Sequence, residues 1–287
     1  MADAKIGIIG GSGVYNIDGV QIVEEVSIDT PFGKPSDKIM IGQIHDKNVA
    51  FLPRHGKNHS FLPSEVPSKA NIYALKSLGV DTIISISAVG SLKKEIKPRD
   101  FVIPNQIIDR TKKRDLSFFG GGIAAHVSLA DPFCNELSDY LYKTIKSKST
   151  VDIHKDETYL CMEGPLFSTR AESHLYRSWG CGIIGMTAIP EAKLAREAEM
   201  CYATIAMSTD YDCWNEEEEE VTLEMLLGNM HANVAEVKSL LLDLISNMPD
   251  YKTCSCSEAA KNAIITQKEF IPAEKKKELG LLYGKYF

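Results

Sequence analysis

Short apolar runs rich in β-branched residues alternate with segments of helical periodicity along most of the chain. Runs of this length, bounded by glycine, proline or polar residues, are typical of buried strands. The second and third predicted strands flank a short polar turn, so we expect them to form a hairpin. The strands predicted in this way are Lys5–Ile9, Ile39–Ile44, Asn48–Leu52, Thr82–Ser87, Phe101–Ile103, Tyr159–Met162, Gly182–Met186 and Cys201–Met207.

Three segments have the periodicity of a helix. In Ser68–Leu78 the apolar residues recur on one side, and Gly79 stands where helices commonly end. Pro190–Met200 is the second segment. Val221–Met248 is the third, and it follows five consecutive glutamates that we expect at a solvated helix start. On the second helix we expect the charged residues to face solvent, namely Glu191, Lys193, Arg196, Glu197 and Glu199.

Strands separated by helices predict an α/β fold with a mixed central β-sheet flanked by helices. Hydrophobic residues make up 44% of the 287 residues and charged residues 25%, as in an ordinary soluble protein with a sizeable core. No internal repeat or low-complexity linker interrupts the pattern. We therefore expect one domain over residues 1–250 and a peripheral tail over residues 251–287, which carries a Cys-Ser-Cys sequence.

The net charge of −7 disfavours nucleic acid as a partner, and an anionic substrate would need a local cationic site. The apolar stretches are far shorter than the roughly 20 residues that a membrane-spanning helix needs. Residues 1–5 run directly into the first predicted strand without a secretory leader. We therefore expect a cytoplasmic protein with no membrane partner.

Seven cysteines are scattered along the chain without the Cys-x-x-Cys spacing of zinc sites, so the sequence predicts no metal site. Most are flanked by apolar or mixed residues, as buried thiols are. Cys254 and Cys256 are two residues apart, where they could close a small strained disulfide or stay reduced. The spacing leaves open whether Cys134 and Cys201 reach bonding distance.

A glycine-rich turn, Gly10-Gly11-Ser12-Gly13, directly follows the first predicted strand. Glycines let backbone N–H groups approach an anion closely, and Ser12 adds a hydroxyl donor. The spacing does not match the Gly-x-Gly-x-x-Gly sequence of dinucleotide-binding folds. A phosphate-binding turn and an ordinary tight turn are the two interpretations that remain.

Three further strand ends carry polar groups suited to an anion. Arg54 and His55 follow one strand, Ser87-Ala88-Val89-Gly90-Ser91 ends a second, and Thr187 follows a third. Arginine suits bidentate recognition of phosphate, although an Arg-His pair on a loop is often only a surface feature. No metal-ligand cluster accompanies these residues in the sequence, so we expect phosphate as a reactant rather than as part of a magnesium nucleotide.

Two carboxylates, Asp210 and Asp212, come just after the strand Cys201–Met207. Ligands of α/β folds bind at this edge of the sheet. An ionised carboxylate only accepts hydrogen bonds, so it selects a ligand with an amine or a protonated ring nitrogen. Acidic residues after strands also form turns or helix caps. Phe167, in a segment with a helix-capping pattern, could present its flat face to a heterocyclic base.

Seven segments of the chain together form a specific pattern. In order along the chain they are Gly10-Gly11-Ser12-Gly13, Thr30-Pro31-Phe32-Gly33-Lys34-Pro35-Ser36-Asp37, Arg54-His55-Gly56, Ser87-Ala88-Val89-Gly90-Ser91, Glu163-Gly164-Pro165, Met186-Thr187 and Thr209-Asp210-Tyr211-Asp212. Together they resemble the trimeric purine nucleoside phosphorylases, and most closely the 5′-methylthioadenosine phosphorylases. The resemblance extends from about residue 6 to residue 248. It departs at Leu166, where the family usually has arginine, and in the tail, which is similar to that of some archaeal members.

The resemblance implies a single-domain nucleoside phosphorylase fold and the phosphorolysis of 5′-methylthioadenosine to adenine and 5-methylthioribose 1-phosphate. Inorganic phosphate would be the co-substrate, with no other cofactor and no metal. The residues implied for phosphate are Ser12, Arg54, His55, Ser87, Ala88 and Thr187. Those implied for the nucleoside are Met186, Phe167, Ser168, Asp210, Asp212, Leu223, Leu226 and Leu227.

Asp210 is the implied general acid toward purine N7, with its pKa raised in a closed site, and Asp212 would face the 6-amino group. His126 matches a family histidine that reaches across a subunit boundary. The resemblance therefore also implies a homo-oligomer, either a trimer or a dimer of trimers.

Three other functions stay open from the residues. A 6-oxopurine nucleoside phosphorylase would need a hydrogen-bond donor opposite O6, whereas carboxylates are acceptors. A non-catalytic purine-binding protein would bind adenine and release no sugar phosphate. A nicotinamide-linked oxidoreductase fits less well, because the glycine spacing fails.

Overall fold

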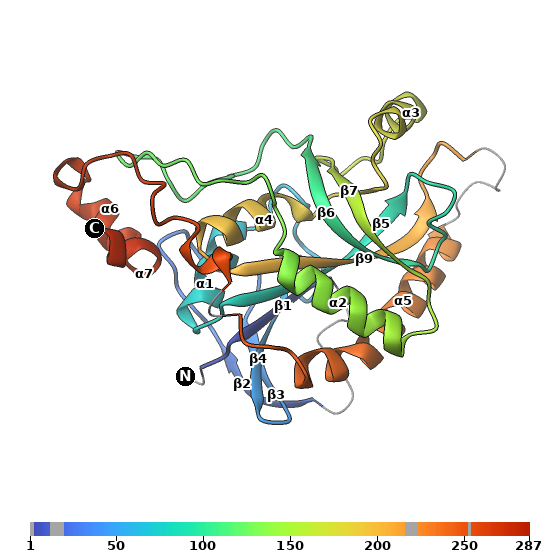
Figure 1. The fold of residues 1–287 in the computed structure, drawn as a ribbon, viewed down its shortest axis with the longest axis horizontal. Coiled ribbons are helices and arrows are strands. Elements are labelled where there is room, and N and C mark those ends of the chain that lie inside the picture. The colour runs from blue at the N-terminus through green and yellow to red at the C-terminus, as the bar shows by residue number, and fades with distance from the viewer. Residues whose placement is uncertain (1–2, 12–19, 216–222, 252–253) are drawn as a thin grey trace.

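The computed structural model describes residues 3–11, 20–215, 223–251 and 254–287, and it is built around one mixed β-sheet (Figure 1). The nine strands described follow the order β2-β3-β4-β1-β5-β8-β7-β6-β9. β5 also pairs with β9, so the last five strands of that order close on themselves. The strands are β1 (Ile6–Gly10), β2 (Gln21–Val26), β3 (Ile39–Ile44), β4 (Lys47–Pro53), β5 (Thr82–Ser91), β6 (Phe101–Asp109), β7 (Ile153–Cys161), β8 (Ile183–Gly185) and β9 (Cys201–Tyr211).

Helices cover both faces of the sheet (Figure 1). The α-helices are α1 (Ser68–Ser77), α2 (Asn135–Lys148), α3 (Arg170–Ser178), α4 (Ala188–Glu197), α5 (Leu223–Ser246), α6 (Ala273–Glu278) and α7 (Gly280–Tyr283). Short 3-10 turns lie in the tail at η1 (Ser255–Glu258), η2 (Lys268–Phe270) and η3 (Gly284–Tyr286). Among the described residues, none of these helices has the length and apolar character needed to cross a bilayer.

Alternate side chains of the central strands are buried in two separate hydrophobic cores, one on each face of the sheet. On β5, Ile84 points to the core shared with α2 and α5, whereas Ile83 points to the core shared with α1 and α4. This division follows from the two-residue period of a strand. β1, β4, β5 and β9 are buried on both faces and pair in parallel, which is why their sequences are nearly continuous apolar runs.

The predicted fold class and most predicted strands are confirmed. β3 and β4 form the expected antiparallel hairpin, with Ile44 paired to Lys47. β2 was not predicted, because apart from Val26 its residues are exposed and carry no pattern of burial. The sequence pattern also did not predict α2, and β6 runs beyond the predicted Phe101–Ile103 to Asp109. Residues 216–222, which include the glutamate run, lie outside the described residues.

The expectation that the charged residues of Pro190–Met200 face solvent is wrong for two of them. Glu191 is 2% exposed and Glu199 is 5% exposed. Glu199 accepts hydrogen bonds from the backbone of Ala260 at 3.0 Å and from the hydroxyl of Tyr286 at 2.6 Å. Its partners come from the tail, which no periodicity within the helix itself could reveal.

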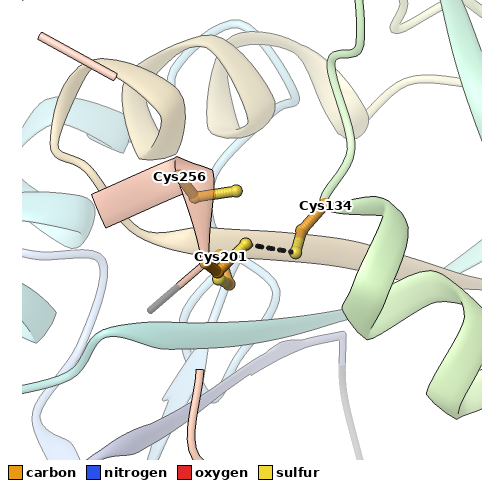
Figure 2. A group of neighbouring side chains, drawn as sticks. Cys134, Cys201 and Cys256 are labelled. Carbon is orange, nitrogen blue, oxygen red and sulfur yellow. Dashed lines mark hydrogen bonds between the residues drawn. The ribbon is translucent and has the colours of Figure 1, made fainter. Parts of the chain in front are cut away.

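The tail contributes buried side chains to both cores. Leu279 and Tyr283 are fully buried in the core beside α1, and Cys254 and Cys256 belong to the core beside α2. Figure 2 shows Cys256 of the tail next to Cys201, the first residue of β9. All seven cysteines are described, and all are free thiols. The tail is therefore held to the sheet by apolar contacts on both sides.

Candidate active site

A cavity of about 320 Å³ opens where β1, β4, β5 and β9 end. Their parallel pairing brings four strand exits to one edge of the sheet, where ligands of α/β proteins commonly bind. The cavity collects polar groups from segments far apart in sequence. The predicted site residues that line it are Arg54, His55, Ser87, Ala88, Phe167, Met186, Thr187, Asp210 and Asp212.

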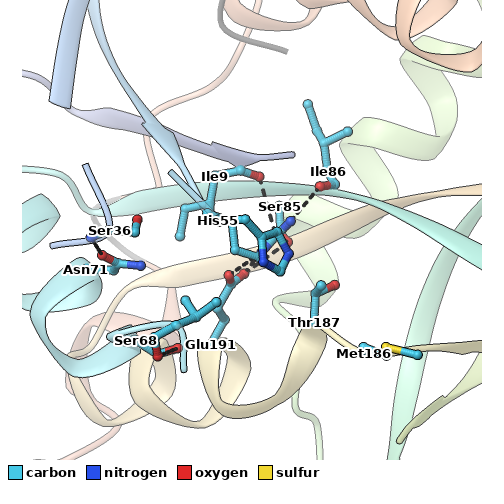
Figure 3. A network of polar contacts seen from close by, with 12 residues as sticks. Ile9, Ser36, His55, Ser68, Asn71, Ser85, Ile86, Met186, Thr187 and Glu191 are labelled. Carbon is cyan, nitrogen blue, oxygen red and sulfur yellow. Dashed lines mark hydrogen bonds and ion pairs between the residues drawn. The ribbon is translucent and has the colours of Figure 1, made fainter. Parts of the chain in front are cut away.

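Arg54 lines the cavity and forms a buried ion pair with Glu191 of α4. Figure 3 shows Glu191 within this network of polar contacts, where Ser85 Oγ donates to its Oε2 at 3.1 Å. Its Nε donates to Glu191 Oε1 at 2.6 Å, and its Nη2 donates to Oε2 at 3.1 Å. Nη2 also donates to Ser85 Oγ at 2.7 Å, and Nη1 donates to the carbonyl oxygen of Ile86 at 3.0 Å. The bidentate edge of the guanidinium is thus directed at a carboxylate of the protein. Among the described residues, one Nη1 N–H keeps no acceptor.

The Arg54–Glu191 pair is close to neutral as a unit. Both side chains are nearly inaccessible, and the hydroxyl of Tyr202 adds a bond to Glu191 Oε2 at 3.0 Å. Burial lowers the pKa of Arg54, but Glu191, with smaller effects from Tyr202 and Tyr159, raises it by more in total, so the pKa ends above its ordinary value and the charge persists. The positive charge of Arg54 is therefore already neutralised by Glu191 when an anion binds. N–H and O–H dipoles must then supply much of the stabilisation of the anion.

His55 is a neutral imidazole at this end of the cavity. Its Nδ1 lies 2.8 Å from the carbonyl oxygen of Phe61, so Nδ1 carries the proton and donates it. Burial, followed by the charge of Arg54, lowers the pKa of His55 to about 4. The ring stacks on His59 with centroids 4.4 Å apart. At neutral pH, Nε2 of His55 is consequently an acceptor, suited to a protonated phosphate oxygen.

Hydroxyl groups complete this polar end. Ser87 is buried in β5, and its Oγ has no hydrogen-bond partner among the described residues. A buried hydroxyl in that condition is ready to bond a ligand. Thr187 stands just before α4, with its Oγ1 3.5 Å from the Tyr159 hydroxyl. Ser12 lies outside the described residues, so its contact with phosphate stays a prediction.

Asp210 and Asp212 line the cavity together at the end of β9. Burial raises the pKa of Asp210 to about 6, although Thr209 Oγ1 donates to its Oδ2 at 2.6 Å, and Asp212 adds a smaller upward effect. Burial also raises the pKa of Asp212, whose Oδ2 is buried without a hydrogen-bond partner among the described residues. A carboxyl that holds its proton up to about pH 6 thus lies beside an unsatisfied acceptor.

A bulge in β9 directs these carboxylates. Val89 of β5 pairs with Ser208, whereas Gly90 pairs with Asp210, so β9 has an extra residue, Thr209, at this point. Bulges next to active sites re-aim side chains in this way. Gly90 is needed opposite the bulge, because a Cβ there would lie 3.2 Å from Asp210 Oδ1.

Helix α5 holds the end of β9 in place. Asn229 Nδ2 donates to the carbonyl oxygen of Thr209 at 2.8 Å, and Asn233 Nδ2 donates to that of Ser208 at 2.8 Å. Met230 and Val234, four residues apart on the same helix, line the cavity with apolar surface. One helix therefore both fixes the carboxylates and supplies an apolar wall.

Several predicted residues do not line this cavity. Leu227 is 39% exposed and contributes no lining, and the side chains of Leu223 and Leu226 are outside the described part of the chain. Ser168 lies one residue beyond Phe167, and its Oγ is 3.7 Å from the sulfur of Met162, a lining residue. The roles proposed for these residues stay predictions.

His126 lies away from the cavity of its own chain. It is exposed on the segment between β6 and α2, and its backbone N–H donates to the carbonyl oxygen of Ala263 in the tail at 2.9 Å. An exposed position leaves this side chain free to face another molecule. Its predicted contribution to a neighbouring subunit is compatible with that position and stays a prediction.

Sequence reasoning missed Glu191, Met230 and Val234. The two α5 residues continue the apolar stripe that begins at Leu223 and Leu226, so extending that stripe by one turn would have found them. Glu191 gave no such signal, because its partner Arg54 is 137 positions away along the chain. Only the packing of α4 against the strand ends reveals the pair.

Comparison with known proteins agrees with this geometry. Residues 5–246 match the model of the Phosphorylase superfamily. The chain belongs to the phosphorylase superfamily. Within that family it is 51% identical to the S-methyl-5′-thioadenosine phosphorylase of Koribacter versatilis, over 99% of this chain and 97% of the relative. It is also 51% identical to the protein of that name from Thermosynechococcus vestitus, over 99% of both chains.

Solved structures of family members share the fold over nearly the full chain. A methylthioadenosine phosphorylase sourced from an antarctic soil metagenomic library superposes with a TM-score of 0.93, at 46% identity, over 98% of this chain and 99% of that one. The methylthioadenosine phosphorylase of Schistosoma mansoni in complex with adenine gives a TM-score of 0.83 at 37% identity, over 90% of this chain and 96% of that one. The match at this identity places the chain in the methylthioadenosine phosphorylase branch of the family.

Proposed function

We propose that this chain cleaves 5′-methylthioadenosine with inorganic phosphate, giving adenine and 5-methylthioribose 1-phosphate. The observation that carries the proposal is the shared cavity, in which Asp210, a carboxyl whose pKa burial raises to about 6, lies with a set of anion-binding dipoles. Family membership and the names of the relatives support the same reaction.

The reaction places opposite charges at the two ends of the cavity. As the glycosidic bond breaks, the sugar becomes oxocarbenium-like and the purine gains negative charge. A phosphate held near Arg54, Ser87 and Thr187 stabilises the cationic sugar and attacks its anomeric carbon. Asp210 gives its proton to purine N7, so that adenine leaves as a neutral molecule. The pair of electrons from the broken C–N bond stays on the purine.

Asp212 supports adenine as the base. Its buried Oδ2 accepts no hydrogen bond within the described residues, and the 6-amino group of adenine is a suitable donor. A 6-oxopurine would present a carbonyl oxygen to the same acceptor, which costs binding energy without a compensating bond. The carboxylate pair therefore favours a 6-aminopurine over inosine or guanosine.

The apolar wall of α5 supports a methylthio group at the 5′ position. Met230 and Val234 line the cavity, and the thioether of Met186 also faces it. Gly164 permits Met186 to come close, because a Cβ on this glycine would lie 2.6 Å from the Met186 sulfur. A 5′-hydroxyl would gain no polar partner from Met230 or Val234, whereas a methylthio group is buried favourably there.

We also infer that the working enzyme is a homo-oligomer, a trimer or a dimer of trimers. Phe167 lines the cavity but is 76% exposed, and the adjacent Leu166 is 82% exposed. Large apolar side chains left this accessible beside a substrate cavity are typical of surfaces covered by a partner. A neighbouring copy that covers them would bring its own residues, His126 among them, to the rim.

A substrate panel tests the proposed function. Initial rates are measured with methylthioadenosine, adenosine, inosine and methylthioinosine, each with and without phosphate. We expect phosphate-dependent release of adenine, fastest with methylthioadenosine. Equal or faster rates with the 6-oxopurines would move the function to the oxopurine phosphorylases. Binding of adenine without any sugar phosphate formed would make the protein a non-catalytic purine binder.

A further inference from the structure

Four cysteines from three separate parts of the chain converge on one side of the sheet (Figure 2). Cys201 begins β9, Cys134 directly precedes α2, and Cys254 and Cys256 come from the tail. All four are buried, and their sulfur atoms lie within 4.8 Å of one another. Isolated buried thiols pack as small apolar groups. Four sulfurs around one point instead form a set of ligands.

We propose that these four cysteines bind one thiophilic divalent metal ion, with zinc as the expected metal, in a structural tetrathiolate site. Zinc takes four thiolates in a tetrahedron at about 2.3 Å, which sets the sulfurs about 3.8 Å apart. The sulfurs of Cys134 and Cys254 are 3.5 Å apart, and no pair exceeds 4.8 Å. The longest sulfur–sulfur separation therefore exceeds that of the zinc tetrahedron by no more than about an ångström.

Positive groups around the cluster favour its ionised form. Arg196, in the last turn of α4, donates from Nη1 to the sulfur of Cys256 at 3.3 Å. Cys134 is the N-cap of the 14-residue helix α2, whose N-terminus carries a partial positive charge. A tetrathiolate around a divalent ion has two net negative charges, and these two features offset part of them. The four thiol protons leave to solvent as the metal–sulfur bonds form.

The cluster has a route by which an ion can enter. A cavity of about 270 Å³ reaches Cys134, Cys254 and Cys256 from the surface, and its charged lining residues are Asp131, Glu136 and Arg196. Carboxylates at the entrance attract a cation, and thiolates beyond them retain it because they are the softer ligands. A structural site of this kind is closed by four protein ligands and keeps no position for substrate.

Disulfide bonds are the competing chemistry for the same sulfurs. A disulfide brings two sulfurs to about 2.05 Å, and bridging Cys254 to Cys256 would close a strained ring across one residue. The four sulfurs here form one group instead of two bonded pairs, and every cysteine is a free thiol. This grouping is the geometry of a shared central ion.

Metal binding would join the tail to the sheet. Two ligands come from the tail, one from the start of β9 and one from the start of α2. Farther along the tail, Leu279 and Tyr283 are buried in the core beside α1. The ion would therefore stabilise the attachment of residues 254–287 to the sheet. The helices and 3-10 turns of this segment are short, so its own secondary structure contributes little to that attachment. The proposal is independent of the proposed function, because none of the four cysteines lines the substrate cavity.

Metal content tests this proposal directly. The full chain is purified under reducing conditions without chelator, and total zinc is measured by plasma mass spectrometry. We expect about one zinc ion per chain. Cys256→Ser and Cys201→Ser should lower the content at least about tenfold, and Arg196→Gln should weaken zinc retention against a chelator by about 10–100-fold. Cys181→Ser is the matched control, because Cys181 is buried in a different core and should leave the zinc content unchanged.

Cobalt substitution of the wild-type chain gives a second test that needs no variant to fold. One equivalent of Co²⁺ in four-thiolate coordination produces intense visible absorption bands, which mixed sulfur and oxygen ligands weaken and shift. The proposal is overturned if the wild type holds no thiophilic metal and shows no such bands, or if Cys256→Ser retains metal as well as the wild type does. Titration that finds these cysteines oxidised in pairs in the freshly purified protein would also overturn it.

Discussion

The chemistry of Asp210 depends on where one proton resides. Burial sets the pKa of this carboxyl near 6, so it is protonated below that pH and ionised above it. A general acid acts in its protonated form, and kcat/KM reports the free enzyme. With methylthioadenosine and a fixed concentration of phosphate dianion, kcat/KM should fall about tenfold per pH unit above about pH 6.

Asp210→Asn supplies the matching comparison. The amide donates a hydrogen bond to N7 but transfers no proton, so kcat should fall by about 10²–10⁴. The decrease of kcat/KM above pH 6 should also disappear. The KM for phosphate should stay near that of the wild type. Asp139→Ala, which changes an exposed carboxylate on α2, is the control and should leave the profile intact. A wild-type kcat/KM that stays level from roughly pH 5 to 9 contradicts the assignment of Asp210.

Glu191 gives a second prediction at the scale of single residues. It is the charge partner of Arg54, and both are buried, so Glu191→Ala leaves an arginine without compensation. Removing one member of a buried pair costs about 3–5 kcal/mol in the free energy of unfolding, which denaturant titration measures. Glu258→Ala breaks an exposed pair with Lys261 and should change stability by less than about 1 kcal/mol. Equal effects of the two substitutions would show that the Arg54–Glu191 pair adds nothing beyond a surface contact.

At the scale of elements, the site depends on close packing between β5 and the bulge of β9. Gly90→Ala places a Cβ 3.2 Å from Asp210 Oδ1 and 3.2 Å from Ile184 Cγ2. Asp210 must then move by a few tenths of an ångström, so we expect kcat to fall about tenfold or more with little change in melting temperature. Gly280→Ala meets open space and serves as the control. Wild-type kcat in Gly90→Ala would mean that the position of Asp210 tolerates displacement.

The strand ends that carry the site could be predicted, whereas the contacts that tune it could not. Apolar runs followed by Arg54, Ser87 and Asp210 mark the exits of buried strands, and parallel pairing brings such exits together. The bulge at Thr209 depends on how two distant strands pair, so no local pattern encodes it. The burial of Glu191 likewise depends on a partner from another element.

At the scale of the whole molecule, the spacing of the cysteines in the sequence did not reveal that four of them lie together, for a related reason. The rule that looks for Cys-x-x-Cys examines one segment at a time. The four clustered cysteines come from a strand start, a helix start and the tail, and they meet only after the sheet and both cores have formed. The tail thus packs against the rest of the chain through apolar side chains and cysteine sulfurs that only the tertiary structure brings together.

The position of His126 leads to a prediction about assembly. It is exposed and does not line the cavity of its own chain, whereas Asp210 does line it. If each site takes Asp210 from one chain and His126 from the next, then Asp210→Ala and His126→Ala damage different chains of the same site. Random mixing of the two variants in a cyclic trimer leaves about a quarter of all sites with both native residues. Every mixed trimer has one such site in three, so isolated mixed trimers should recover about a third of wild-type activity. Each variant alone should be strongly impaired, with a raised KM for the nucleoside in His126→Ala.

Co-expression with two different affinity tags isolates the mixed oligomers, and native mass spectrometry verifies their composition before rates are measured. A site contained within one chain predicts no recovery, because every chain then carries a damaged site of its own. Recovery therefore separates a shared site from a self-contained one, and it does so without depending on how tightly the subunits associate. A verified mixed oligomer that stays as inactive as Asp210→Ala alone would place His126 outside the site and leave the exposed Phe167 to be explained by another contact.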